Sequence, residues 1–144
     1  MSAWTEVKPA ITGPVTMPVA TEQDLLRVRA ALRSAADLAG FGLVASTKLV
    51  TAGSELARNI LRYADGDGSV CICNEGDAPL CGVRAIFTDS GPGIADLEAA
   101  MRDGFTTAGG LGLGLPGARR LVDQFSIESA PGRGTKVVIA QWTH

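Results

Sequence analysis

The sequence predicts an α/β fold of the α+β kind, a two-layer sandwich in which a mixed, mostly antiparallel sheet carries its helices on one face. Two observations predict it. Helical and strand-like segments interleave unevenly along the 144 residues, and several neighbouring strands are separated only by short turns of glycine, proline and aspartate. The regular strand–helix alternation of a doubly wound parallel sheet is missing, and we find no internal repeat.

The first half of the chain predicts an edge strand followed by two helices. Apolar residues alternate over 15–19, and a proline within this strand suits an edge position. Thr21 and Asp24 have the spacing of a capping box, and the helix they begin continues at helical spacing to Gly40. A second helix is expected from about 43 to 64.

The second half predicts mainly strands joined by turns. We expect an arm over residues 1–14 and a single domain over 15–144. The remaining elements are a hairpin of strands 69–74 and 81–89, a brief helix at 95–102, a loop at 103–112, a helix at 114–124, and final strands at 125–129 and 135–142.

Composition limits the function. Hydrophobic residues make up 46% and charged residues 19% of the chain, which suits one folded domain. The formal net charge of -2 offers no basic excess, so we expect no nucleic-acid partner. No apolar run approaches the roughly 18 residues of a membrane span. Without a secretory signal, and with an odd number of cysteines, we expect a cytoplasmic protein that binds no membrane.

The cysteines are expected to be structural. Cys71 and Cys73 share one face of a strand, and Cys81 lies on the next strand. A zinc site would need a fourth ligand, and the chain's one histidine is the terminal His144. We therefore expect the three thiols to be buried as small apolar side chains.

A first polar motif lies on the second helix. Glu55 and Asn59 are four residues apart and share a face, which Arg62 extends. A carboxylate can accept a proton, an amide oxygen can bind Mg²⁺, and a guanidinium can pair with phosphate. The alternative is a solvated helix face with an i,i+4 hydrogen bond.

A second motif follows the strand at 81–89. Asp89 continues the inward-facing alternation of that strand, so its carboxylate needs a hydrogen-bond donor. The donor is either an exocyclic amine such as that of adenine, or backbone N–H groups of the next turn. Gly91 and Gly93 would let this turn approach a flat ring closely.

A third motif alternates glycine with leucine from Gly109 to Leu115, at the start of a helix. Amides at a helix start attract phosphate, and a flexible hinge is the alternative. Neither familiar phosphate loop fits, because no lysine follows the glycines and no apolar strand precedes them. Thr135 begins the last strand, where its hydroxyl could bond a base or a water near Asp89.

The order of these motifs resembles the ATP-binding (Bergerat-type) fold of the gyrase, Hsp90, histidine kinase and MutL superfamily. Within it the chain is similar to the anti-sigma-factor serine/threonine kinases, and most similar to their RsbT-like switch-kinase branch. The segments that carry the resemblance are SELARNILRYA (54–64), TDSGPGI (88–94), DGFTTAGGLGLGLPGARRLVD (103–123) and IESAPGRGTKVV (127–138).

The resemblance implies roles for individual residues. Glu55 would activate the attacking hydroxyl, Asn59 would hold Mg²⁺, and Asp89 would read the adenine amine with Thr135 nearby. Residues 104–112 would form a mobile lid. The implied ATP-binding residues are Asn59, Arg62, Asp89, Gly91, Gly93, Ile94, Thr106, Thr107, Gly110, Leu111, Gly112, Leu113, Gly114 and Thr135, of which Arg62 extends the family pattern.

The implied function is ATP-dependent phosphorylation of a STAS-domain antagonist protein in a bacterial partner-switching pathway. Only Ala108 and Gly109 separate Thr107 from the glycine run, a lid shorter than that of members that clamp sigma factor, which argues against direct sigma-factor binding. The alternative is a nucleotide-gated switch that binds and activates a PP2C-type phosphatase. A histidine-kinase catalytic domain is disfavoured, because no dimerisation helix with a phosphorylatable histidine is present.

Overall fold

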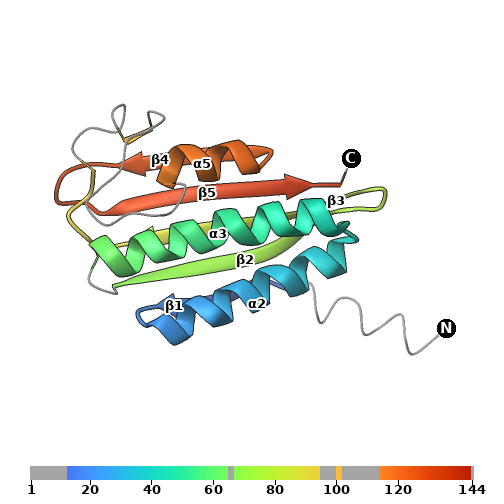
Figure 1. The fold of residues 1–144 in the computed structure, drawn as a ribbon, viewed down its shortest axis with the longest axis horizontal. Helices are drawn as coiled ribbons and strands as arrows, with labels where there is room; N and C mark the ends of the chain where they lie inside the picture. Colours follow the sequence, from blue (N-terminus) through green and yellow to red (C-terminus); the bar gives the residue numbers. More distant parts are fainter. Residues whose placement is uncertain (1–12, 65–66, 95–99, 102–113, 144) are drawn as a thin grey trace.

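The computed structural model describes residues 13–64, 67–94, 100–101 and 114–143. Within them the chain forms one five-stranded sheet with three helices packed on it (Figure 1). The predicted arm at 1–14 and the predicted short helix at 95–102 lie outside the described residues, apart from 13–14 and 100–101. The α+β sandwich is confirmed.

The sheet has the strand order β1-β2-β3-β5-β4, and all four pairings described are antiparallel. The strands are β1 (Val15–Val19), β2 (Gly68–Asp77), β3 (Leu80–Asp89), β4 (Gln124–Ser129) and β5 (Thr135–Trp142). β1 is an edge strand, as its proline predicts. The β2–β3 hairpin is confirmed, but its pairing continues beyond the predicted strand end to Asp77 and Leu80, which leaves a tighter turn.

The helices are α2 (Glu22–Ala39), α3 (Leu43–Tyr63) and α5 (Gly114–Leu121), and they cover one face of the sheet (Figure 1). α3 packs against both α2 and α5. α5 ends before the predicted residue 124, because Gln124 already pairs with Ala140 in the sheet. The Asp123 amide donates to the Gln141 side chain at 2.9 Å, an interaction that local sequence does not reveal.

Strand register determines which sheet residues face the helices. Val83, Ala85 and Phe87 alternate along β3 and are buried in the core beneath α2 and α3. Asp89 is next in this alternation, so it faces the helix layer at the end of the strand. Its partner across the sheet on β5 is Thr135. The fold therefore places a carboxylate and a hydroxyl where the apolar core ends.

The cysteines differ from their prediction. Cys71 and Cys73 alternate with the buried Val70 and Ile72, which pack in the core, so these two thiols lie on the sheet face away from the helices. All three cysteines are free and only half-buried, although Cys81 does contact the core. The alternation of side chains along a strand predicts that Cys71 and Cys73 share a face of the sheet. It does not predict which face the helices cover.

In the part of the chain that the structure describes, we find no helix with the length and apolar character needed to span a bilayer.

The start of α2 confirms the predicted capping box. Thr21 Oγ1 accepts from the Asp24 amide at 3.2 Å, and the Asp24 carboxylate accepts from the amides of Ala20 and Thr21 at 2.8 and 3.1 Å. Arg27 Nη1 donates to the same carboxylate at 2.9 Å. The hydrogen bond from Ala20, supported by those from Thr21 and Arg27, holds the pKa of Asp24 below its ordinary value despite the opposing effect of burial.

We predict that Asp24→Asn destabilises the protein in a pH-dependent way. A lowered folded-state pKa means that the carboxylate's contribution is complete above the ordinary value of 3.8 and is lost as pH falls through the folded pKa below it. Urea denaturation should therefore show a large difference between wild type and variant at about pH 7 and a smaller one at about pH 3. Glu22→Gln is the control, because it removes a first-turn charge that makes no hydrogen bond or ion pair with the described residues. An equal difference at both pH values would contradict this account.

Candidate functional site

Asp89 and the turn that follows it form the centre of the candidate site. We call residues 89–94 the acid turn. Asp89 Oδ1 accepts from the Gly91 amide at 2.9 Å, which is one of the two donors that the sequence left open. Its other oxygen, Oδ2, has no hydrogen-bond partner among the described residues. One acceptor is thus engaged by the chain, and a second is available to a ligand.

The acid turn packs against the end of α3. A Cβ at Gly91 would lie 3.0 Å from the backbone of Ala64, the residue that caps α3. The Ser90 amide donates to the Asp67 carbonyl at 3.1 Å. We expected Gly91 to let the turn approach a ligand closely. In the structure its close approach is to the backbone of Ala64.

The acid turn is also interlocked with the turn between β4 and β5, residues 130–134, which we call the hairpin turn. Gly93 and Gly134 have φ of +80° and +75°. A Cβ at Gly93 would collide with the Ala130 carbonyl, and one at Gly134 would collide with the Asp89 carbonyl. The two turns therefore meet backbone to backbone, which only glycine allows at these positions.

Thr135 lies beside Asp89, and a residue that we did not predict supports it. The Ser129 hydroxyl is 2.8 Å from Thr135 Oγ1 and accepts from the Ile94 amide at 2.7 Å. Phe125 and Ile127 alternate inward along β4, and Ser129 takes the next inward position. A polar residue at the end of an apolar alternation is the sequence pattern that could have predicted its role. Ile94, one of the predicted site residues, takes part through its backbone amide, which donates to Ser129.

The polar ridge of α3 runs from the core towards the surface. Glu55 is buried, with 8% of its surface exposed, so a fully solvated face is excluded there. Its Oε1 accepts from Arg58 Nη1 at 3.1 Å, an i,i+3 pair that we did not predict. Asn59 is half-buried and Arg62 is exposed, and neither has a hydrogen-bond or ion-pair partner among the described residues.

The packing of α3 brings Asn59 towards the acid turn. Ile60, its neighbour, packs so closely on Gly68 that a Cβ there would collide with it, and Gly68 pairs with Asp89 across the sheet. The carboxyl ends of α3 and β3 and the amino end of β5 lie together on the left in Figure 1. The site is therefore built where these ends meet.

The chemistry of the residues present fits a magnesium ion. The unengaged Asn59 amide offers a hard oxygen, which Mg²⁺ prefers. No group of three or more His, Cys, Asp or Glu side chains is arranged to hold a metal ion in the described segments. A bound Mg²⁺ would thus need most of its ligands from phosphate and water, as is usual for this ion.

The predicted lid at 104–112 lies outside the described residues. Of the predicted phosphate-binding glycines the structure describes Gly114, the first residue of α5, with φ of +68°, and α5 packs along α3. The other predicted residues of this segment also lie outside the described residues, so their roles stay predictions: Thr106, Thr107, Gly110, Leu111, Gly112 and Leu113.

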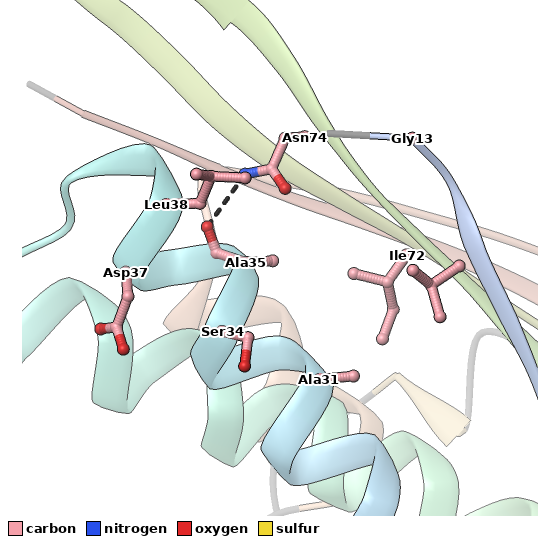
Figure 2. A pocket seen from close by; sticks show the side chains of 9 residues that line it. Gly13, Ala31, Ser34, Ala35, Asp37, Leu38, Ile72 and Asn74 are labelled. Carbon is pink, nitrogen blue, oxygen red and sulfur yellow. Dashed lines mark hydrogen bonds between the residues drawn. The ribbon is translucent and has the colours of Figure 1, made fainter. Parts of the chain in front are cut away.

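A separate groove of about 530 Å³ lies between α2 and strands β1 and β2 (Figure 2). Asn74 Nδ2 donates to the Ala35 carbonyl at 2.9 Å, and Leu38 and Ile72 supply apolar surface. Among the described residues, its lining includes no predicted site residue, and its one charged side chain is that of Asp37. The described lining suits a polyphosphate poorly, because it offers no cation.

The family follows from comparison with known proteins. Residues 44–143 match the histidine kinase-, DNA gyrase B- and HSP90-like ATPase family. The chain belongs to this family. It is 45% identical over 124 residues to the serine/threonine-protein kinase RsbT of Bacillus subtilis (strain 168), a match that covers 86% of this chain and 92% of that protein. Within the ATPase family it is therefore a serine/threonine-protein kinase of the RsbT type.

Solved structures share the fold. The RsbU and RsbW domains of Rv1364c from Mycobacterium tuberculosis match with a TM-score of 0.63 and 23% identity over 92% of this chain, which spans 34% of that longer chain. The mycobacterial sensor histidine kinase MprB matches with a TM-score of 0.54 and 19% identity, covering 92% of this chain and 97% of that one. At these identities the likeness extends to the fold alone.

We predict that Gly134→Ala damages the site more than Gly132→Ala. Both glycines have positive φ, +75° and +76°, but a Cβ at Gly132 meets no atom within 4 Å, whereas at Gly134 it meets the Asp89 carbonyl. Gly134→Ala should lose about 2 kcal/mol more unfolding free energy than Gly132→Ala, because overpacking adds to the shared backbone strain. Urea denaturation measures both, and equal losses would contradict the interlock.

Proposed function

We propose that this kinase transfers the γ-phosphoryl group of ATP to a serine or threonine of a STAS-domain antagonist protein, in a bacterial partner-switching pathway. The observation that carries the proposal is Asp89 Oδ2, which no described residue binds, on a residue that faces the helix layer beside Thr135 at the end where Asn59 also lies. The relation to RsbT supports the reaction type.

The proposed base pocket is the acid turn with Thr135. Asp89 Oδ2 accepts an N–H of the adenine amine, while Oδ1 stays bonded to Gly91. A hydrogen bond to a charged acceptor contributes about 1.5–3 kcal/mol, enough to orient the base. The backbone interlock with the hairpin turn keeps the carboxylate from swinging away from this position.

The proposed phosphate end lies along α3 and at the start of α5. Asn59 would hold Mg²⁺, which when bound neutralises phosphate charge. Arg62 is exposed and has no ion-pair partner among the described residues, so its guanidinium is free to contact phosphate. The glycine lid from 104 to 112 would close over the triphosphate and exclude water.

Glu55 is the proposed general base. The substrate hydroxyl oxygen forms a bond to the γ-phosphorus, the bond between that phosphorus and the β,γ-bridging oxygen breaks, and ADP leaves. The hydroxyl proton passes to the Glu55 carboxylate. Arg58, at 3.1 Å from Oε1, fixes the orientation of this carboxylate and leaves Oε2 for the proton.

A nucleotide-gated switch that binds and activates a PP2C-type phosphatase is the second candidate. The ion pair between Glu55 and Arg58 favours it, because the guanidinium occupies one of the two carboxylate oxygens that a general base would use. In either case we propose a cytoplasmic protein, since the cysteines are free thiols, as a reducing compartment maintains them.

We predict that phosphoryl transfer depends on Glu55 and Asn59. Incubation with labelled ATP, Mg²⁺ and the STAS-domain proteins encoded beside this chain should label one of them. Glu55→Gln and Asn59→Ala should each lower the rate by at least about 100-fold, because one removes the base and the other a metal ligand. ATP binding should survive in Glu55→Gln, since Glu55 is proposed to act on the substrate hydroxyl and not to hold the nucleotide.

Glu128→Gln, a change at an exposed residue of β4, is the matched control and should label the partner at the wild-type rate. Labelling by Glu55→Gln at the control rate would contradict the kinase mechanism. If Glu55→Gln lost labelling but still activated the phosphatase, the regulatory output would belong to the switch and not to phosphoryl transfer.

A further inference from the structure

The Ser129 hydroxyl has a place in the site that the predicted roles do not use. It accepts from the Ile94 amide at 2.7 Å, lies 2.9 Å from the Gly134 carbonyl oxygen, and lies 2.8 Å from Thr135 Oγ1. These three partners belong to the acid turn, the hairpin turn and β5. One side chain therefore joins every segment of the proposed base pocket.

A proton count decides how these bonds are oriented. The Ser129 hydroxyl has one proton and can donate it either to Gly134 O or to Thr135 Oγ1. Gly134 is buried, and its carbonyl has no other hydrogen-bond donor among the described residues. Because a buried carbonyl without a donor is costly, we assign the Ser129 hydroxyl proton to the hydrogen bond with the Gly134 carbonyl oxygen.

The orientation of Thr135 follows from that assignment. With the Ser129 proton committed to Gly134, the contact at 2.8 Å requires the Thr135 hydroxyl to donate to Ser129 Oγ. Ser129 then accepts twice and donates once, which satisfies its full hydrogen-bonding capacity. Thr135 keeps its own lone pairs for a ligand and presents a hydrogen-bond acceptor.

We propose that Ser129 is a positioning residue that fixes the Thr135 hydroxyl as an acceptor beside Asp89 Oδ2, and thereby sets selectivity for 6-amino purine nucleotides. An exocyclic amine offers two N–H donors to these two acceptors. A 6-oxo purine would present a carbonyl oxygen to both and be repelled. This inference rests on the proposed function, which places the adenine amine at Asp89.

The test compares ATP with inosine triphosphate, which carries a carbonyl in place of the amine, by calorimetric titration of the full chain with Mg²⁺. Wild type should bind ATP at least about tenfold more tightly, the expected effect of losing hydrogen bonds to a charged group. Ser129→Ala should lower this ratio by about threefold, because the Thr135 hydroxyl becomes free to donate while the charged Asp89 carboxylate still favours the amine. Ser129→Thr, which retains the hydroxyl, should keep the wild-type ratio of ATP affinity to inosine triphosphate affinity.

A double-mutant cycle separates positioning from a merely structural role. In a Thr135→Val background, Ser129→Ala should leave the ATP-to-inosine-triphosphate ratio unchanged, since the hydroxyl through which it acts is gone. Ser126→Ala, on the exposed face of the same strand, is the control and should match wild type. Thermal melts of all variants identify any that fail to fold.

The outcomes are distinct. If Ser129→Ala weakens both nucleotides by the same factor, Ser129 acts only through stability and the proposal is overturned. If wild type binds both nucleotides equally, the acceptor assignment is wrong although nucleotide binding stands. If wild type binds neither nucleotide, the proposed function fails as well.

Discussion

The backbone contact between the acid turn and the hairpin turn is the constraint on which the site depends. Asp89 ends a strand, where a side chain would ordinarily be free to move with a flexible turn. Gly134 lies so close to the Asp89 carbonyl that no side chain fits, and the Gly132 amide donates to Pro92 at 2.8 Å. These contacts hold the backbone of the acid turn, and the hydrogen bond from the Gly91 amide to Asp89 Oδ1 orients the carboxylate before any ligand arrives, which lowers the entropic cost of binding.

The antiparallel sheet explains how distant parts of the sequence reach this point. β3 ends and β5 begins at the same end of the sheet, so Asp89 and Thr135 become direct neighbours. α3 crosses the same face and ends there, which brings Asn59 towards them while Glu55 lies about one turn further from the acid turn. The arrangement suits a ligand with an apolar, amine-bearing base at one end and a charged phosphate chain at the other.

Local patterns predicted much of this structure. Capping at the start of α2 and the inward alternation ending at Asp89 depend on residues a few positions apart, and both are confirmed. Features set by register between distant strands were missed. Ser129 gains its hydrogen bonds only when β4 pairs with β5, and Gln141 binds the Asp123 amide from across the sheet. Helix packing alone decides that Cys71 faces outwards.

An NMR titration tests the central claim, that a purine nucleotide binds at the acid turn, most directly. With backbone amides assigned in the full chain, ATP and Mg²⁺ should shift the resonances of residues 89–94, Thr135 and Asn59 most strongly. The groove beside α2, reported by Leu38 and Asn74, should remain unshifted. Shifts concentrated in that groove, or none at the acid turn under saturating ATP, would contradict the account.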